Sequence, residues 1–520
     1  MLNRWMLATI SFALMAASGA NDVEAASEAE CQALQSQDFS HVIDASTHLM
    51  ATGTVAAAND VPAYCQVKGY VSSSVEFELR LPMEDWNGKF VKRGCGGFCG
   101  SVFIDACDNH VKDGYACIAS DMGHTSTALD AKWAYNDLQA EIDFGYRATH
   151  VVTVAGKAIT EAFYSNAPQR SYFMGCSTGG RQGLVEAQRF PYDFDGIVAG
   201  APVIDETGAG MELIWTVVAN RDENGKQILP TSKVPMIHDA VIAKCDMNDG
   251  LEDGLIGDAR DCDFEPAELQ CIGQDRDNCL TTAQVETVNK MYGGPVNSDG
   301  MALYTGGVQR GSELNWIGNY ISEDGGLSVY ENFMSDMFRY LNFMPDPGPS
   351  WQQTDFDFDS DYKRLGLMEA IYTGSNPDLR KFKARGGKIL TYQGWSDQSV
   401  VPLNIIDYYE TVTKTMGGQE ATQDFYRLFM IPGMNHCSGG AGAYAIDYLA
   451  HMEDWVENGN EPDVLIGVHP NIRVDSAGTD LPLNDDQVDF SRPTFPYPAK
   501  VQYDGSGDPS SASSFVRVDP

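Results

Sequence analysis

Basic residues are scarce in this sequence. Its 520 residues include 35 lysines and arginines against 73 aspartates and glutamates, which gives a formal net charge of −38. A surface this acidic repels phosphate groups. We therefore expect neither a nucleic-acid partner nor a membrane partner.

Long hydrophobic runs are also lacking. After the N-terminus, no segment reaches the roughly 18 consecutive apolar residues typical of a membrane-spanning helix. The N-terminus carries only a 13-residue apolar run, Trp5–Ala17, preceded by Arg4 and followed by small residues. This pattern is typical of a signal peptide, which we assign to residues 1–25. It predicts a secreted or periplasmic protein, in which the twelve cysteines form disulfides.

Internal repeats and heptads are absent, and the chain is too long for one ordinary domain. Apolar runs alternate with helical patterns on both sides of a less regular middle segment. Such alternation is typical of an α/β fold with a mostly parallel sheet. We predict strands at 89–92, 115–119, 172–174, 197–199, 387–392 and 425–431, and helices at 149–163 and 181–190.

The middle segment predicts an insertion into this α/β core. Strand signals fade there, while glycine and acidic residues increase. The predicted organisation is a signal peptide (1–25), a first core part (26–202), an inserted loop-rich domain (203–378) and a second core part (379–520).

The pentapeptide Gly175-Cys176-Ser177-Thr178-Gly179 is the strongest chemical signal. It matches G-x-S-x-G and lies between a predicted strand and a predicted helix. Glycines permit the sharp turn that exposes a serine hydroxyl, and the following helix supplies amide donors. We therefore predict that Ser177 is a nucleophile; a structural turn is the alternative.

A serine nucleophile needs a base and an acid, which follow it in that fold in the order acid, then histidine. His238, His436, His451 and His469 come after Ser177. His436 follows the apolar run ending at Ile431, as a catalytic loop residue would, so we favour it. Asp397 directly follows the predicted strand 387–392 and is the candidate acid.

Two cysteines adjoin these candidates. Cys176 precedes Ser177, and Cys437 follows His436. If Ser177 and His436 meet, a Cys176–Cys437 disulfide would tie their two loops together; two unrelated buried thiols are the alternative.

The combination resembles the tannase and feruloyl esterase family. The similarity rests on residues 86–90, 175–183, 386–389 and 432–437, the last reading Pro-Gly-Met-Asn-His-Cys. The resemblance implies an α/β-hydrolase core with a large lid and the Cys176–Cys437 disulfide. It also implies Ser177, Asp397 and His436 as the triad, and the bridges Cys31–Cys65 and Cys271–Cys279.

Residues 245–255 form an acidic, glycine-containing loop that can wrap a hard cation. It does not follow the EF-hand pattern, and an acidic turn without metal is the alternative. The resemblance implies a structural Ca²⁺ site in the lid, clipped by Cys245–Cys262. Its implied ligands are the carboxylates of Asp246, Asp249 and Asp253 and the backbone carbonyls of Leu251 and Leu255.

The oxyanion hole needs two backbone amides. We expect them to be those of Thr178 and Gly96, with Gly97 as second choice. Cys95 and Cys99 lie in the same glycine-rich loop. Together with Cys107 and Cys117 they allow three pairings, of which we expect Cys99–Cys107 with Cys95–Cys117.

These features predict a secreted serine hydrolase for esters of aromatic acids, such as feruloyl, galloyl or terephthalate half-esters. The substrate class follows from the resemblance. A serine peptidase on the same fold and a catalytically silent, calcium-bound binding protein are the alternatives. Lid residues that can contact substrate are Trp316, Tyr320, Phe333, Phe338, Arg310 and Arg339, although packing or surface roles are commoner for such residues.

Overall fold

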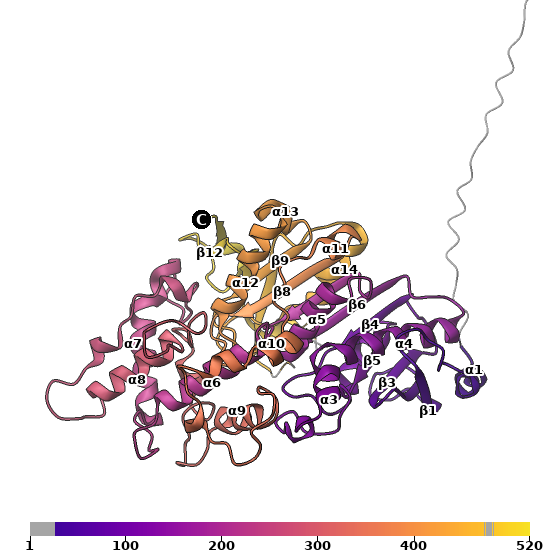
Figure 1. The fold of residues 1–520 in the computed structure, drawn as a ribbon. Coiled ribbons are helices and arrows are strands. Elements are labelled where there is room, and N and C mark those ends of the chain that lie inside the picture. Colours follow the sequence, from indigo (N-terminus) through magenta and orange to yellow (C-terminus); the bar gives the residue numbers. More distant parts are fainter. Residues whose placement is uncertain (1–25, 473, 475–480, 482) are drawn as a thin grey trace, which may run out of the picture.

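The computed structural model describes residues 26–472, 474, 481 and 483–520. The predicted signal peptide lies outside these residues. A nine-stranded sheet, in the order β1-β2-β3-β5-β4-β6-β7-β8-β9, forms the centre of the molecule (Figure 1). Its strands are β1 (Thr47–Val55), β2 (Tyr64–Val71), β3 (Val75–Pro82), β4 (Lys89–Arg93), β5 (Ala116–Ser120), β6 (Arg170–Cys176), β7 (Gly196–Gly200), β8 (Lys388–Gly394) and β9 (Tyr426–Ile431).

The sheet is mostly parallel. Neighbouring strands pair in parallel along β5-β4-β6-β7-β8-β9. They pair antiparallel along β1-β2-β3-β5. The residues of β5, β7 and β9 are all buried, as expected for parallel strands covered on both faces. The predicted α/β class is confirmed. The antiparallel strands β1–β3 were not predicted.

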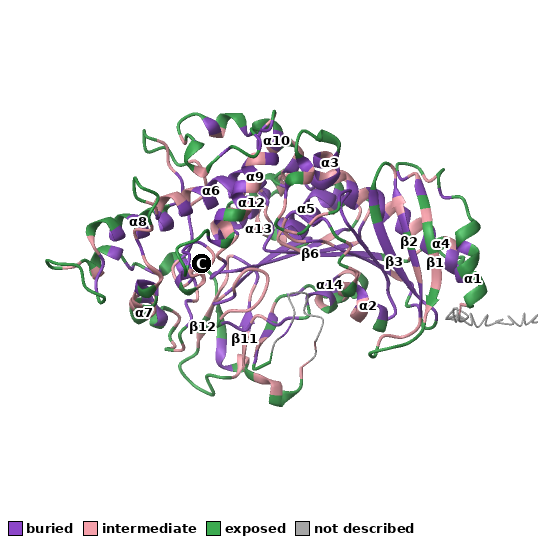
Figure 2. Ribbon diagram, turned by 90° about the horizontal axis from the view of Figure 1, so that it is seen from below, coloured by how far each residue is buried: buried purple, intermediate pink, exposed green. Residues whose placement is uncertain are grey.

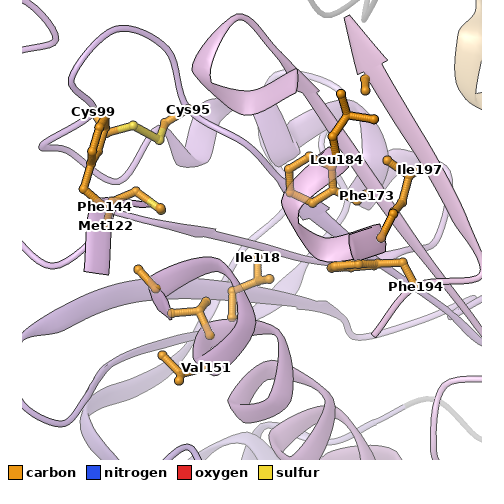
Figure 3. Close-up of a cluster of buried hydrophobic side chains, with 14 of the residues drawn as sticks. Cys95, Cys99, Ile118, Met122, Phe144, Val151, Phe173, Leu184, Phe194 and Ile197 are labelled. Carbon is orange, nitrogen blue, oxygen red and sulfur yellow. A yellow bond between two sulfur atoms is a disulfide. The ribbon is translucent and has the colours of Figure 1, made fainter. Parts of the chain in front are cut away.

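Helices cover both faces of the sheet (Figure 2). One hydrophobic cluster joins the sheet to α4 (Ala148–Tyr164), α5 (Thr178–Arg189) and α12 (Pro402–Met416). Figure 3 shows part of this cluster, where Phe173, Leu184 and Ile197 pack together. A second cluster packs α2 (Asp108–Lys112) and α14 (Tyr448–Asn458) on the opposite face. Smaller helices of the core are α1 (Glu28–Ala33), α3 (Leu138–Ile142), α11 (Arg380–Ala384) and α13 (Gln419–Gln423).

The chain leaves the sheet after β7 and returns at β8. Most of the intervening residues pack around a hydrophobic cluster of their own, which we call the lid core, whereas the buried Met368 and Tyr372 belong to the first cluster. The lid helices are α6 (Glu206–Ala219), α7 (Val234–Cys245), α8 (Thr282–Gly293), α9 (Val329–Tyr340) and α10 (Gly366–Tyr372). Figure 1 shows this group beside the β7–β9 end of the sheet.

The last part of the chain forms two small antiparallel pairs that were not predicted. They are β10 (Leu465–Pro470) with β11 (Val488–Thr494), and β12 (Lys500–Tyr503) with β13 (Phe515–Val518). Arg492 on β11 bonds to Asp253 in the acidic lid loop, with the atoms 2.7 Å apart. The C-terminal strands therefore hold the lid loop against the core.

Candidate active site

Ser177 lies on a sharp turn between β6 and α5. Its backbone has φ 63° and ψ −124°, outside the usual regions for a residue with a side chain. A Cβ on Gly175 would lie 2.7 Å from the backbone of Gly179, so the turn requires glycine there. The backbone strain thus occurs at the residue whose hydroxyl the turn presents to the cavity.

Asp397 and His436 form a bonded pair beside this turn. Asp397 follows β8, and only 1% of its surface is exposed. Its Oδ2 lies 2.9 Å from Nδ1 of His436. Because the carboxylate accepts, Nδ1 carries the proton of the neutral ring, and Nε2 of His436 is its accepting nitrogen. Amides of Ser399 and Val400 and the side chain of Gln393 donate the other hydrogen bonds to Asp397, at 2.8–2.9 Å.

The other candidate histidines have different surroundings. His238 bonds to Glu313 in the lid, and His469 stacks on Phe490. His451 lies on α14, and burial lowers its pKa. His436, in contrast, lines the same two cavities as Ser177.

The Cys176–Cys437 disulfide joins the serine turn to the histidine loop across 261 positions, with a Cα–Cα distance of 5.9 Å. Of the other expected bridges, Cys31–Cys65, Cys245–Cys262 and Cys271–Cys279 are present as well. No described cysteine is free.

The expected pairing of the remaining four cysteines is wrong. The structure contains Cys95–Cys99 and Cys107–Cys117 instead. Cys95 and Cys99 belong to the cluster on the α5 face of the sheet, whereas Cys107 and Cys117 belong to the cluster on the α14 face. The sheet therefore separates the two pairs, and each bridge closes a short local loop.

The glycine loop after β4 lies against the start of α5. Thr178 Oγ1 donates to the Gly97 carbonyl at 2.7 Å, and Gln182 contacts Cys95 through both its oxygen and its nitrogen. A Cβ on Gly96 would meet nothing within 4 Å, so this residue borders open space. The loop thus presents backbone beside Ser177, as an oxyanion hole requires.

Two cavities meet at Ser177, His436 and Gly97. The first, of about 540 Å³, lies over the core and includes Arg93, Tyr392 and Tyr448; we call it the core chamber. The second, of about 320 Å³, lies under the lid and has mainly apolar lining; we call it the lid chamber. Its apolar residues are Leu129, Val203, Ala209, Leu213, Val329, Phe333, Met337 and Val400.

Only Phe333, among the six lid residues singled out from the sequence, lines the lid chamber. Trp316, Tyr320 and Phe338 are buried in the lid core. Arg310 bonds to the Phe264 carbonyl, and Arg339 bonds to that of Trp351. Tyr330 and Met337, which line the chamber from the same helix as Phe333, were missed because their helical spacing is also that of a packed face.

The acidic lid loop gathers three carboxylates. Asp246 accepts hydrogen bonds from the amides of Asp253 and Gly254, and Asp249 accepts one from Leu251. Burial, together with the charges of Asp253 and Asp246, raises the pKa of Asp249 to about 6. This cluster of oxygen donors fits a hard divalent cation in chemistry. The three carboxylates do not all lie within 4.8 Å of one another, and Asp253 bonds to Arg492.

Comparisons with known proteins agree with this architecture. The family model described as "Tannase and feruloyl esterase" matches residues 59–518. Mono(2-hydroxyethyl) terephthalate hydrolase of Piscinibacter sakaiensis is 32% identical, with 96% of this chain and 93% of that protein covered. Probable feruloyl esterase B-2 of Aspergillus flavus is 32% identical, with 83% of this chain and 86% of that protein covered.

Solved structures show the same fold. Feruloyl esterase B from Aspergillus oryzae superposes with a TM-score of 0.83 at 28% identity, covering 94% of this chain and 100% of that one. Tannin acyl hydrolase from Aspergillus niger gives a TM-score of 0.74 at 22% identity, covering 96% of each chain. The mostly parallel sheet and the serine turn after β6 define an α/β-hydrolase.

The chain belongs to the tannase and feruloyl esterase family, and it is a carboxylic ester hydrolase. Its substrates are therefore small-molecule esters. The six disulfides are consistent with an extracellular protein. Within the described part of the chain, no helix combines the length and apolar character needed to cross a membrane.

Proposed function

We propose that the protein is a secreted serine esterase that cleaves esters of aromatic acids, with Ser177, His436 and Asp397 as its triad. The observation that carries this proposal is the 2.9 Å bond between Asp397 and His436, because His436 lines the same two cavities as Ser177. The relatives named as a feruloyl esterase and as a terephthalate monoester hydrolase support the aromatic acyl group.

In the proposed reaction, Nε2 of His436 takes the proton of Ser177 as its Oγ attacks the ester carbonyl. Asp397 stabilises the resulting imidazolium and holds the ring in place. The amides of Thr178 and Gly96 stabilise the negative charge on the carbonyl oxygen. His436 then protonates the leaving alcohol, and water repeats these steps to release the acid.

We assign the aromatic acyl group to the lid chamber and the alcohol to the core chamber. Phe333 lines the lid chamber, and its ring stacks on Phe98 with centroids 4.2 Å apart. This packing fixes a flat apolar surface on which a second ring can lie. The core chamber, which contains Arg93 and Asp105, suits a polar alcohol.

A substrate panel tests this proposal. The purified protein is assayed with methyl ferulate, methyl gallate, a terephthalate half-ester, an acetyl ester and a peptide. We expect aromatic esters to be cleaved with the highest kcat/KM and the peptide to be untouched. Phe333→Ala should raise KM for aromatic esters by roughly tenfold while leaving the acetyl ester little changed. Equal effects on both esters would contradict the acyl assignment.

We also propose that the acidic lid loop holds a structural Ca²⁺. The donor set supports it: carboxylates of Asp246, Asp249 and Asp253, with the carbonyls of Leu251 and Leu255 in the same loop. The Cys245–Cys262 disulfide closes the loop, and bound Ca²⁺ would offset the burial and the mutual repulsion that raise the pKa of Asp249.

A further inference from the structure

A second cluster of ligating side chains lies on the core, at the junction of α4 and α5. Within the described residues it is the one group of three such side chains whose ligand atoms all lie within 4.8 Å of one another. Its members are His150 on α4, Glu186 on α5 and Asp193 in the segment between α5 and β7. The motifs singled out in the sequence and the proposed ester chemistry use none of them.

Glu186 is the unusual member. Only 1% of its surface is exposed, and neither of its carboxylate oxygens has a hydrogen-bond partner. Burial first, and the neighbouring carboxyl of Asp193 next, raise the pKa of Glu186 well above its usual value. Two carboxyl groups in contact need a shared positive charge between them, which either a proton or a metal ion can supply.

Rigid neighbours hold the other two members in place. The His150 ring stacks on Phe190, with centroids 3.9 Å apart and planes 6° from parallel. Its Nδ1 lies 2.6 Å from Oδ2 of Asp193. The backbone of Asp193 bonds to the Phe190 carbonyl and to the Lys157 side chain. A preset orientation of this kind lowers the cost of binding a ligand.

We propose that His150, Glu186 and Asp193 form a zinc site. Imidazole nitrogen and carboxylate oxygen are both zinc ligands, and a water molecule would fill the fourth position of the tetrahedron. The imidazole argues against Ca²⁺, which prefers oxygen ligands. Zinc-bound ligand atoms lie about 3.3 Å apart in a tetrahedron. Nδ1 of His150 and Oδ2 of Asp193 are now 2.6 Å apart, so they need to separate by less than about 1 Å.

The surrounding charges permit a cation here. Lys157 and Lys92 face Glu186, and Arg385 lies near Lys157. Lys92 donates to the Arg93 carbonyl and the Ser120 hydroxyl, and Lys157 donates to the Asp193 backbone carbonyl, so the hydrogen bonds of both lysines go to atoms other than the three ligand atoms. His150 and Asp193 are each partly exposed, which gives the ion a route from solvent.

The site lies away from the proposed ester chemistry. Glu186 lies nine positions after Ser177 along α5, which corresponds to about 13 Å of helix. Zinc at this position would tie the end of α5 to α4 and to the segment that leads into β7. Zinc binding here does not depend on which ester the protein cleaves.

Zinc binding to the mature protein tests the inference. The protein is stripped with a chelator and then saturated with Ca²⁺, so that the lid loop does not compete. Zn²⁺ is titrated against a chromogenic chelator. We expect one equivalent of tightly bound zinc and a higher Tm. His150→Gln and Glu186→Gln should each weaken binding on the order of 100-fold. The matched controls His451→Gln and Glu453→Gln, both on α14, should bind zinc as the parent does.

Zinc binding that is equally tight in Glu186→Gln and the parent would overturn the site and leave a shared proton as the explanation. Co²⁺ added to the unaltered protein gives a readout that does not depend on any variant. Intense visible bands of a four- or five-coordinate site with nitrogen ligation would support the proposal. A spectrum like that of aqueous Co²⁺ would contradict it.

Discussion

Nδ1 of His436 lies 2.9 Å from Oδ2 of Asp397, although 39 positions separate the two residues. The bond forms because β8 and β9 are parallel neighbours, so the loops that follow them leave the same edge of the sheet. Ser177 leaves the same edge after β6. The proposed triad therefore depends on strand order, and the following predictions test its parts.

Ser177→Ala should lower kcat for aromatic esters by about 10⁴-fold or more, because it removes the nucleophile and leaves only binding and the oxyanion hole. Steady-state kinetics with a chromogenic ester measure the loss, and circular dichroism checks the fold. Activity within tenfold of the parent would contradict the assignment.

Asp397→Asn should lower kcat by about 10⁴-fold, because an amide in place of the carboxylate favours the wrong tautomer of His436. His436→Ala should cause a similar loss. His451→Ala is the matched control and should retain parental activity, since His451 lies on α14 and does not line either chamber. Loss of activity in the control alone would reassign the base.

Removal of the Cys176–Cys437 bridge by a double Ala substitution should lower activity more than stability explains. The bridge joins the turn of Ser177 to the loop of His436, and small displacements of reacting groups are costly. Activity is measured well below the Tm of the variant. The matched control removes Cys271–Cys279, which closes a short loop in the lid and should leave kcat unchanged. Equal losses in both variants would contradict a positioning role.

Calcium removal should lower the Tm, because a ligand that binds only the folded state stabilises it. Chelation and the double variant Asp246→Ala/Asp253→Ala should have similar, non-additive effects. Calorimetry gives the Tm, and elemental analysis gives the calcium content. An unchanged Tm after chelation, with no calcium found, would leave the segment as an acidic loop.

Glu212 on α6 should make stability depend on pH. It is 1% exposed and bonds to Thr216, and burial raises its pKa to about 8. At pH values between the usual pKa of a glutamate and about 8, Glu212 is ionised in the unfolded chain but keeps its proton in the folded chain. The contribution of Glu212 to the free energy of unfolding is therefore full below its usual pKa. It falls as the pH rises towards 8, by up to about 1.4 kcal/mol per pH unit.

Glu212→Gln tests this pH dependence. The variant should match the parent near pH 4 and exceed its Tm near pH 8, because the amide never needs to lose a proton. Thermal unfolding across this range measures the difference. A Tm difference that is the same at every pH would show that the pKa of Glu212 does not differ between the folded and the unfolded chain.

The sequence by itself determined the α/β class, the family and the residues that the site brings together. These are local signals: glycines at the serine turn, and Asp397 and His436 each in the loop that follows a buried strand. A strand's end and a turn's strain depend on a few neighbouring residues, so a single stretch of sequence specifies them.

The tertiary structure alone decided the contacts between distant segments. Cys95 and Cys117 cannot pair because they face opposite sides of the sheet. Phe333 lines the lid chamber while Phe338, on the same helix, packs in the lid core. In each case the local hydrophobic pattern is compatible with either arrangement, because burial of apolar surface favours both. Only the packing of the whole chain decides which residues a given side chain contacts.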